Sequence, residues 1–100
     1  MKVGLKAIGD LRDYLGRGVQ EIDLDEGAHV TDLLYAIELR WGAGLPAYLW
    51  DSRIYKFRGP VVLIIDKKTV QDVDTPLKEG MEIIVMKAIA GGNGIGFLEE

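Results

Sequence analysis

The residues with the clearest chemical meaning in this sequence lie near its end, where Ala90 is followed by Gly91 and Gly92. A glycine pair after a predicted strand adds nothing to a fold, because glycine loses more conformational entropy on ordering than any other residue. Without a Cβ, however, a glycine backbone can enter a narrow active site and leave its carboxylate open to attack. The pair therefore predicts a segment that is delivered into a partner's active site, with a frayed terminus as the alternative.

Other polar residues point less clearly to chemistry. Pairs such as Asp23 with Asp25, or Asp72 with Asp74, do acid–base work only in a pocket that shifts their pKa values, and strand alternation and turns already account for them. The single histidine, His29, has no second base beside it and precedes a predicted helix, where polar residues more often cap. Since the sequence has no cysteine, thiolate metal sites are excluded, and we expect neither a metal nor a cofactor.

Two further segments have compositions that favour ligand binding. Residues 92–96 are glycine-rich, but a phosphate loop leads into a helix N-terminus, and too few residues follow for such a helix. Residues 48–58 interleave aromatic and basic side chains, which favours nucleotide stacking, anchoring of a protein partner, or a lid over the core. These side chains are Tyr48, Trp50, Arg53, Tyr55, Lys56, Phe57 and Arg58.

Composition limits the remaining classes. One hundred residues make one domain, and 48% hydrophobic with 28% charged residues is typical of a globular protein. The net charge of −4 argues against nucleic acid as a partner, because phosphate binding needs a basic surface. The longest apolar run, Val61–Ile65, is far shorter than the roughly 18 residues of a membrane helix. Without a recognisable secretory leader, we expect a cytoplasmic protein that contacts no membrane.

Hydrophobic periodicity predicts the elements that must position the glycine pair. Alternation predicts a hairpin of strands over 3–8 and 19–25, and a stripe at 30, 33, 34, 37 and 41 predicts a helix. Further strands are predicted at 61–65, 69–70 and 81–86, with a capped helical turn at 74–80. The predicted core residues are Val3, Leu5, Ile22, Leu24, Val30, Leu33, Leu34, Ile37, Val62, Ile64, Ile83 and Val85.

This order of elements predicts an α+β fold. A helix stripe between strands can be buried only against one face of one sheet, and a right-handed crossover places the last strand beside the first, in parallel. The result is a ubiquitin-like β-grasp fold, with a mixed four- to five-stranded sheet and one main helix. We expect the β-grasp domain over 1–87 and a flexible, glycine-rich tail over 88–100.

Four segments together resemble a known family. They are Leu11-Arg12, Val30-x-Asp32-Leu33-Leu34, the run from Asp74 to Ile83, and the end Ala88-Ile89-Ala90-Gly91-Gly92. Over residues 3–92 the sequence resembles the small subunit of molybdopterin synthase and the related MoaD–ThiS-like sulfur carriers.

The resemblance implies a carrier rather than an enzyme. Carriers of this kind are adenylated at their terminal glycine by an ATP-dependent, ubiquitin-activating-type adenylyltransferase and are then converted to a thiocarboxylate. In molybdopterin synthesis the sulfur passes to a pterin precursor inside the large subunit of molybdopterin synthase. By this resemblance, Gly92 would bear the thiocarboxylate. Gly91, which has no side chain, would leave room for the chain end to enter a narrow active site. Because 93–100 follow here, a protease would first have to cut after Gly92.

A partner surface is expected on the sheet face that the helix leaves open. A short chain has no second layer for that face, so we expect Phe57, Ile65 and Met86, with Ala90 in the tail, to form an apolar partner-binding surface. The alternative function is a ubiquitin-like modifier or a non-catalytic β-grasp interaction module. Which acceptor receives the sulfur stays open at this stage.

Overall fold

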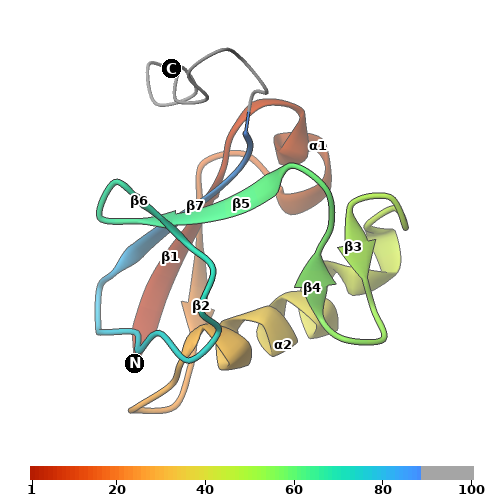
Figure 1. Cartoon of the computed structure of the whole chain (residues 1–100). Helices are drawn as coiled ribbons and strands as arrows, with labels where there is room; N and C mark the ends of the chain where they lie inside the picture. Colours follow the sequence, from red (N-terminus) through yellow and green to blue (C-terminus); the bar gives the residue numbers. More distant parts are fainter. Residues whose placement is uncertain (89–100) are drawn as a thin grey trace.

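The main sheet has five strands and carries one long helix across one of its faces (Figure 1). The computed structural model describes residues 1–88. In spatial order the strands are β2, β1, β7, β5 and β6, and the central pair β1–β7 is parallel while the other pairs are antiparallel. Their bounds are Lys2–Ala7 for β1, Val19–Asp23 for β2, Val61–Ile65 for β5, Lys68–Val70 for β6 and Glu82–Lys87 for β7.

The other elements join these strands. The main helix is α2 (Val30–Trp41), and a hairpin of β3 (Trp50–Asp51) and β4 (Lys56–Phe57) lies beside its C-terminal end (Figure 1). The remaining short elements are η1 (Gly9–Leu11), α1 (Arg12–Leu15) and η2 (Gly42–Gly44). The ubiquitin-like β-grasp architecture predicted from the sequence is confirmed, including the parallel pairing of the first and last strands.

Helix α2 forms where the apolar stripe predicts it. Val30, Leu33, Leu34 and Ile37 are all buried against the sheet. The first turn is fixed by Asp32, whose carboxylate accepts a hydrogen bond of 2.8 Å from the backbone N–H of His29. A carboxylate in the first turn also suits the positive end of the helix dipole.

The core between α2 and the sheet, called here the inner cluster, takes alternate residues from each strand. β1 contributes Val3, Leu5 and Ala7, and β7 contributes Ile83 and Val85. From β5 the inner residues are Val61, Leu63 and Ile65. The prediction of Val62 and Ile64 as core residues on the helix side is therefore wrong. Every residue of this strand is apolar, so no alternation marks its inner face.

The segment before β7 also differs from the prediction. Residues 74–80 form no helical turn, because Pro76 makes an isolated antiparallel bridge with His29 and the N–H of Leu77 donates to the carbonyl of Ala28 at 2.9 Å. The hydroxyl of Thr75 donates to the carbonyl of Asp72 at 2.7 Å. Backbone pairing with the start of α2 takes the groups that a helical turn would have used.

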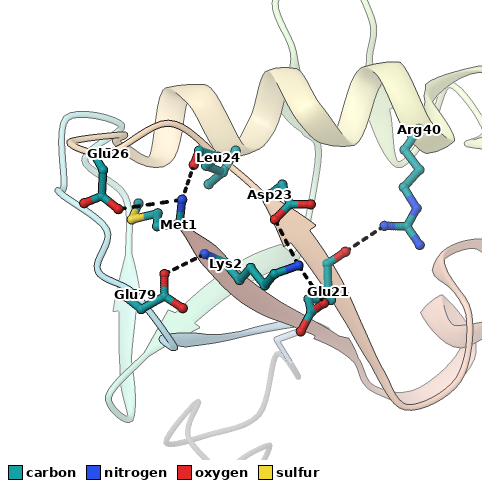
Figure 2. Close-up of polar contacts among 8 residues, drawn as sticks. All are labelled: Met1, Lys2, Glu21, Asp23, Leu24, Glu26, Arg40 and Glu79. Carbon is teal, nitrogen blue, oxygen red and sulfur yellow. Dashed lines mark hydrogen bonds and ion pairs between the residues drawn. The ribbon is translucent and has the colours of Figure 1, made fainter.

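Polar contacts tie the chain start to the edge of the sheet (Figure 2). The Lys2 ammonium lies 3.3 Å from the carboxylates of both Glu21 and Asp23 on β2. The hydrogen bond to Asp23, and to a lesser extent the one to Glu21, raises the pKa of Lys2 above its ordinary value. The guanidinium of Arg40 on α2 donates to the backbone carbonyl of Glu21 at 3.0 Å (Figure 2). These contacts link helix and edge strand at the end of the sheet opposite to the end of β7.

Candidate functional site

The point at which the chain leaves the sheet is fixed by three contacts. The N–H of Ala88 donates to the carbonyl of Pro60 at 2.8 Å, and the N–H of Ile8 donates to the carbonyl of Val85 at 3.0 Å. The ammonium of Lys87 donates to the carboxylate of Asp10 at 2.9 Å. The segment with the glycine pair therefore starts from a defined place, at the end of a central strand.

A second apolar cluster lies on the sheet face opposite α2, close to this exit point. It consists of five residues: Ile8, Val62, Ile64, Ile84 and Met86. We call it the outer cluster. Val62 lies directly opposite Met86, and Ile64 lies opposite Ile84, in the antiparallel β5–β7 register. Directly opposed side chains on one face contact each other, so the four strand residues form one continuous block.

The expected partner surface of Phe57, Ile65 and Met86 is not one surface. Met86 belongs to the outer cluster, whereas Ile65 is buried in the inner cluster and Phe57 packs against it. Ile65 follows Ile64 in an all-apolar strand, and successive side chains point to opposite faces. The sequence prediction missed Ile8, Val62, Ile64 and Ile84. For Ile84 the sequence does hold a signal. In β7, Ile84 and Met86 alternate with the core residues, which places both on the outer face.

The other predicted functional residues, Ala90, Gly91 and Gly92, lie outside the described residues.

The β3–β4 hairpin is held together by one buried carboxylate. Asp51 accepts hydrogen bonds from the backbone N–H of Arg53 at 2.9 Å and from the guanidinium of Arg58 at 2.8 Å. Hydrogen bonds from Arg53, aided by the positive charge of Arg58, hold the pKa of Asp51 below its ordinary value. The charges of Arg53 and Arg58 are thus partly neutralised by Asp51, which weakens the nucleotide-stacking interpretation.

The aromatic residues of the same segment divide into two groups. Trp50 is buried in the inner cluster, its indole N–H donates to Glu38 at 2.6 Å, and Phe57 packs edge-on against it with ring centroids 4.7 Å apart. Tyr48 is 65% exposed, and Tyr55 lies with its ring 5.3 Å from that of Tyr35. Trp50 and Phe57 therefore form the lid over the core that was one of the three interpretations.

The aspartates and the histidine that could do acid–base chemistry have structural partners. Asp23 pairs with Lys2, and the carboxylate of Asp72 accepts the N–H of Asp74 at 2.9 Å. His29 precedes the first residue of α2 and pairs through its backbone with Pro76. Within residues 1–88, no group of three or more histidine and acidic side chains could hold a metal ion. None of the helices described there has the length and apolar character needed to span a bilayer.

The sheet order, the main helix α2 on one face and the anchored exit of the last strand define a ubiquitin-like β-grasp protein. A family model described as the ThiS family matches residues 5–92. The chain therefore belongs to the ThiS family. Among curated proteins, no sequence matches it significantly.

Solved structures show the same fold. A small archaeal modifier protein, SAMP1 from Haloferax volcanii, is 18% identical with a TM-score of 0.72, over 92% of this chain and 100% of that one. A putative molybdopterin converting factor, subunit 1, from Pyrococcus furiosus is 26% identical with a TM-score of 0.66, over 88% and 98%. A chain of the BexX/CysO complex of Amycolatopsis orientalis is 22% identical with a TM-score of 0.61, over 90% and 99%.

Membership of this family places the chain among small ubiquitin-like sulfur carriers and their relatives. Proteins of this kind are generally not catalysts themselves and act together with partner enzymes.

Proposed function

We propose that this protein is a sulfur carrier of the molybdopterin synthase small-subunit type, with Gly92 as the residue that bears the thiocarboxylate. One observation carries the proposal: the family match begins at residue 5 and ends at residue 92, the second glycine of the pair. The eight residues that follow lie outside the family pattern, which supports their removal before the carrier acts.

The chemistry needs no catalytic side chain on the carrier. A carboxylate at Gly92 attacks the α-phosphate of ATP, forms an acyl-adenylate and releases pyrophosphate. A hydrosulfide ion then attacks the acyl carbon and AMP leaves, which gives the thiocarboxylate directly. A persulfide as the donor would first give an acyl disulfide, from which a second thiol releases the thiocarboxylate by disulfide exchange. The adenylating enzyme and the sulfur acceptor supply the catalytic groups, and the carrier supplies a narrow, unbranched chain end.

The fold suits a carrier that must present its end to two enzymes in turn. The described chain anchors Ala88 at the end of β7, and four more residues reach Gly92, a span of about 13 Å at 3.3 Å per residue. Residues 89–92, two of which are glycines, lose conformational entropy on threading, so affinity is expected to come from the folded surface and position from the tail.

The acceptor that we propose is the pterin precursor held by the large subunit of molybdopterin synthase. The support is the similarity, at 26% identity, to a putative molybdopterin converting factor, subunit 1. The partners would then be a ubiquitin-activating-type adenylyltransferase, that large subunit, and a protease that cuts the Gly92–Asn93 bond.

A ubiquitin-like modifier is the second candidate. Its support is the similarity to structures of small archaeal modifier protein 1, which is 18% identical to this chain. A modifier would use the same adenylated glycine but would end in an amide bond to an amine of a target protein. Both candidates require a free carboxylate at Gly92.

Pyrophosphate exchange tests the shared step. Three proteins are compared with ATP and the host's adenylating enzyme: the full chain 1–100, the chain ending at Gly92, and the latter with Gly92→Leu. We expect exchange only with the unmodified chain that ends at Gly92. Equal exchange by the full chain would remove the need for processing, and no exchange by either would remove the carrier function.

Intact mass separates the two candidates. Protein isolated from the native host is expected to lack residues 93–100 and to carry the mass increase of one oxygen replaced by sulfur. Conjugates with other proteins through Gly92, without any sulfur-bearing form, would favour the modifier. A full-length protein in the cell would favour the interaction module instead.

A further inference from the structure

A groove of about 440 Å³ runs between the end of β2 and the side of α2 that does not face the sheet. Its apolar lining includes two side chains of α2, Tyr35 and Leu39. Its acidic lining consists of Asp23, Asp25, Glu26 and Asp32. Among residues 1–88, no lysine or arginine lines this groove.

The apolar side of the groove is exposed and continues beyond it. Tyr35 is 48% exposed and Leu39 is 71% exposed, and residues four apart lie on the same face of a helix. Tyr55, in the turn between β3 and β4, places its ring 5.3 Å from the ring of Tyr35 and is 37% exposed. Exposed apolar side chains that form one continuous surface are typical of a binding site for another molecule.

The backbone of Tyr55 supports a role for its ring beyond folding. Its φ value is 54°, in the left-handed region that bulky residues rarely adopt. A glycine would adopt this conformation without strain. Strained backbone of this kind is found mainly at functional sites. The turn itself therefore does not favour tyrosine, and the exposed surface shared with Tyr35 gives the ring a purpose.

The carboxylates beside this surface indicate the charge of its partner. Asp23 is paired with Lys2 at 3.3 Å. Within residues 1–88, no basic group forms an ion pair with Asp25 or Asp32. Arginine and lysine suit such a site, because their aliphatic stems pack on apolar surface while their cations meet carboxylates and tyrosine rings.

We propose that these exposed apolar side chains and the two carboxylates without an ion pair form a docking surface for an arginine-bearing or lysine-bearing segment of a partner protein. The residues of this acidic docking surface are Asp25, Asp32, Tyr35, Leu39 and Tyr55. The segment binds through its side chains rather than as an added strand. At the edge of β2, the guanidinium of Arg40 already donates to the carbonyl of Glu21 at 3.0 Å.

The acidic docking surface is separate from the outer cluster and from the exit of β7. It lies on α2, whereas the outer cluster lies on the sheet face opposite α2. Its carboxylates follow the end of β2, which pairs with the start of β1, while the end of β7 pairs with the end of β1. A partner bound here therefore leaves the exit of β7 free. The inference goes beyond the proposed function and does not depend on adenylation at Gly92.

Amide NMR titration of the full chain 1–100 with a peptide tests the docking. The probe is the hexapeptide Arg-Ala-Arg-Ala-Arg-Ala, and the control peptide has glutamate in place of arginine. We expect saturable shifts at Asp25, Asp32, Tyr35 and Leu39 with the probe only, and none at Lys87. Spermidine, a cation without a peptide backbone, should bind more weakly. Equal binding of spermidine, or shifts spread over all exposed carboxylates, would overturn the proposal, because either would show attraction by charge alone.

Two substitutions locate the binding. Tyr35→Ala should weaken the peptide affinity about tenfold, as for an aromatic anchor, and Asp25→Asn about threefold, as for an exposed ion pair. The matched controls are Tyr48→Ala, at a tyrosine that is 65% exposed, and Asp66→Asn, at an exposed aspartate; both should leave the affinity unchanged. Equal losses in the controls would refute the assignment of the surface.

Tyr55→Gly separates binding from folding. It removes both the ring and the backbone strain, so we expect weaker peptide binding with a urea midpoint that is unchanged or higher. A lower midpoint with unchanged binding would show that the tyrosine serves the turn, which would overturn its assignment to the docking surface.

These results are independent of the carrier chemistry. Exchange by the chain ending at Gly92 without peptide binding would refute only the acidic docking surface. Peptide binding without exchange would refute only the carrier function.

Discussion

The inner and outer faces of the main sheet are built from similar aliphatic residues, but they differ in extent and in what lies against them. Among the described residues, the inner cluster contains nineteen buried side chains and gathers them from the sheet, α2, α1 and the β3–β4 hairpin. The outer cluster contains two buried side chains and three partly buried ones, from β5, β7 and Ile8, the residue that follows β1.

The difference assigns separate roles to the two faces. Burial of apolar area is the main stabilising term in folding, so the inner cluster accounts for most of the stability of the domain. The outer cluster, with two buried side chains, contributes far less to stability, and we propose it as the surface that a partner enzyme contacts. It also lies beside the exit of β7, so that a partner bound there would find the glycine tail within reach.

The largest expected effect tests the inner face. Leu33→Ala removes a fully buried side chain of α2 and should lower the free energy of unfolding by about 2–5 kcal/mol, through lost transfer energy and the cavity left behind. Urea denaturation measures it. The matched control is Leu39→Ala on the same helix, where the side chain is 71% exposed and the change should stay within about 0.5 kcal/mol. Equal losses would show that α2 is not packed as described.

Substitutions at two adjacent residues of β7 allow a direct comparison of the stability that each face contributes. Ile83 is fully buried in the inner cluster, whereas Ile84 belongs to the outer cluster and is only partly buried. Ile83→Ala should cost about 2–5 kcal/mol, and Ile84→Ala about 1 kcal/mol. Denaturation of the chain ending at Gly92 gives both values. A larger loss for Ile84 would reverse the assignment of the two faces.

A smaller effect tests how the hairpin closes the inner cluster. Asp51→Asn removes the charge that Arg53 and Arg58 share, so it should lower the urea midpoint at neutral pH by less than Leu33→Ala does. The pKa of Asp51 is lowered by folding, so its contribution is present above the ordinary value of 3.8 and is lost as the pH falls through the folded value.

The measurement is therefore the midpoint difference between the native protein and the variant from neutral pH down to about pH 2. The difference should shrink below the ordinary pKa of an aspartate. The control is Asp66→Asn, an exposed aspartate in the β5–β6 turn, for which no comparable difference is expected. A difference for Asp51 that is constant with pH would show that its charge does not stabilise the hairpin.

The smallest expected effect is a gain in the free energy of unfolding, from a turn residue that belongs to neither cluster. Asp66 and Lys67 both have positive φ values, 53° and 67°, in the two-residue turn between β5 and β6. Lys67→Gly gives the Asp-Gly pair that this turn type favours and should raise the free energy of unfolding by about 0.5 kcal/mol. Lys78→Gly, in a loop where φ is not positive, should give no gain. A loss at Lys67 would show that its side chain is needed.

Much of the candidate site could be predicted from the sequence, but not its shape. The strand at the end of the domain, its parallel partner and the position of Met86 on the sheet face opposite α2 follow from local alternation and the crossover rule. The four other members of the outer cluster were missed. Phe57 and Ile65 were placed there wrongly, because both belong to segments whose register depends on distant contacts.

Local sequence patterns were sufficient to assign the elements with a clear hydrophobic period, which are the hairpin β1–β2, helix α2 and strand β7. Their hydrophobic repeats are local, so each element can be assigned, with its buried face, before any packing is known.

Two features depend on contacts between distant segments: which face of β5 packs against α2, and the path of residues 74–80. In β5 all five residues are apolar, so pairing with β7 and β6 sets its orientation. In the second case, a bridge from Pro76 to His29 overrides the local preference for a helical turn. In both, the deciding contact joins residues far apart in the sequence, where no local pattern records it.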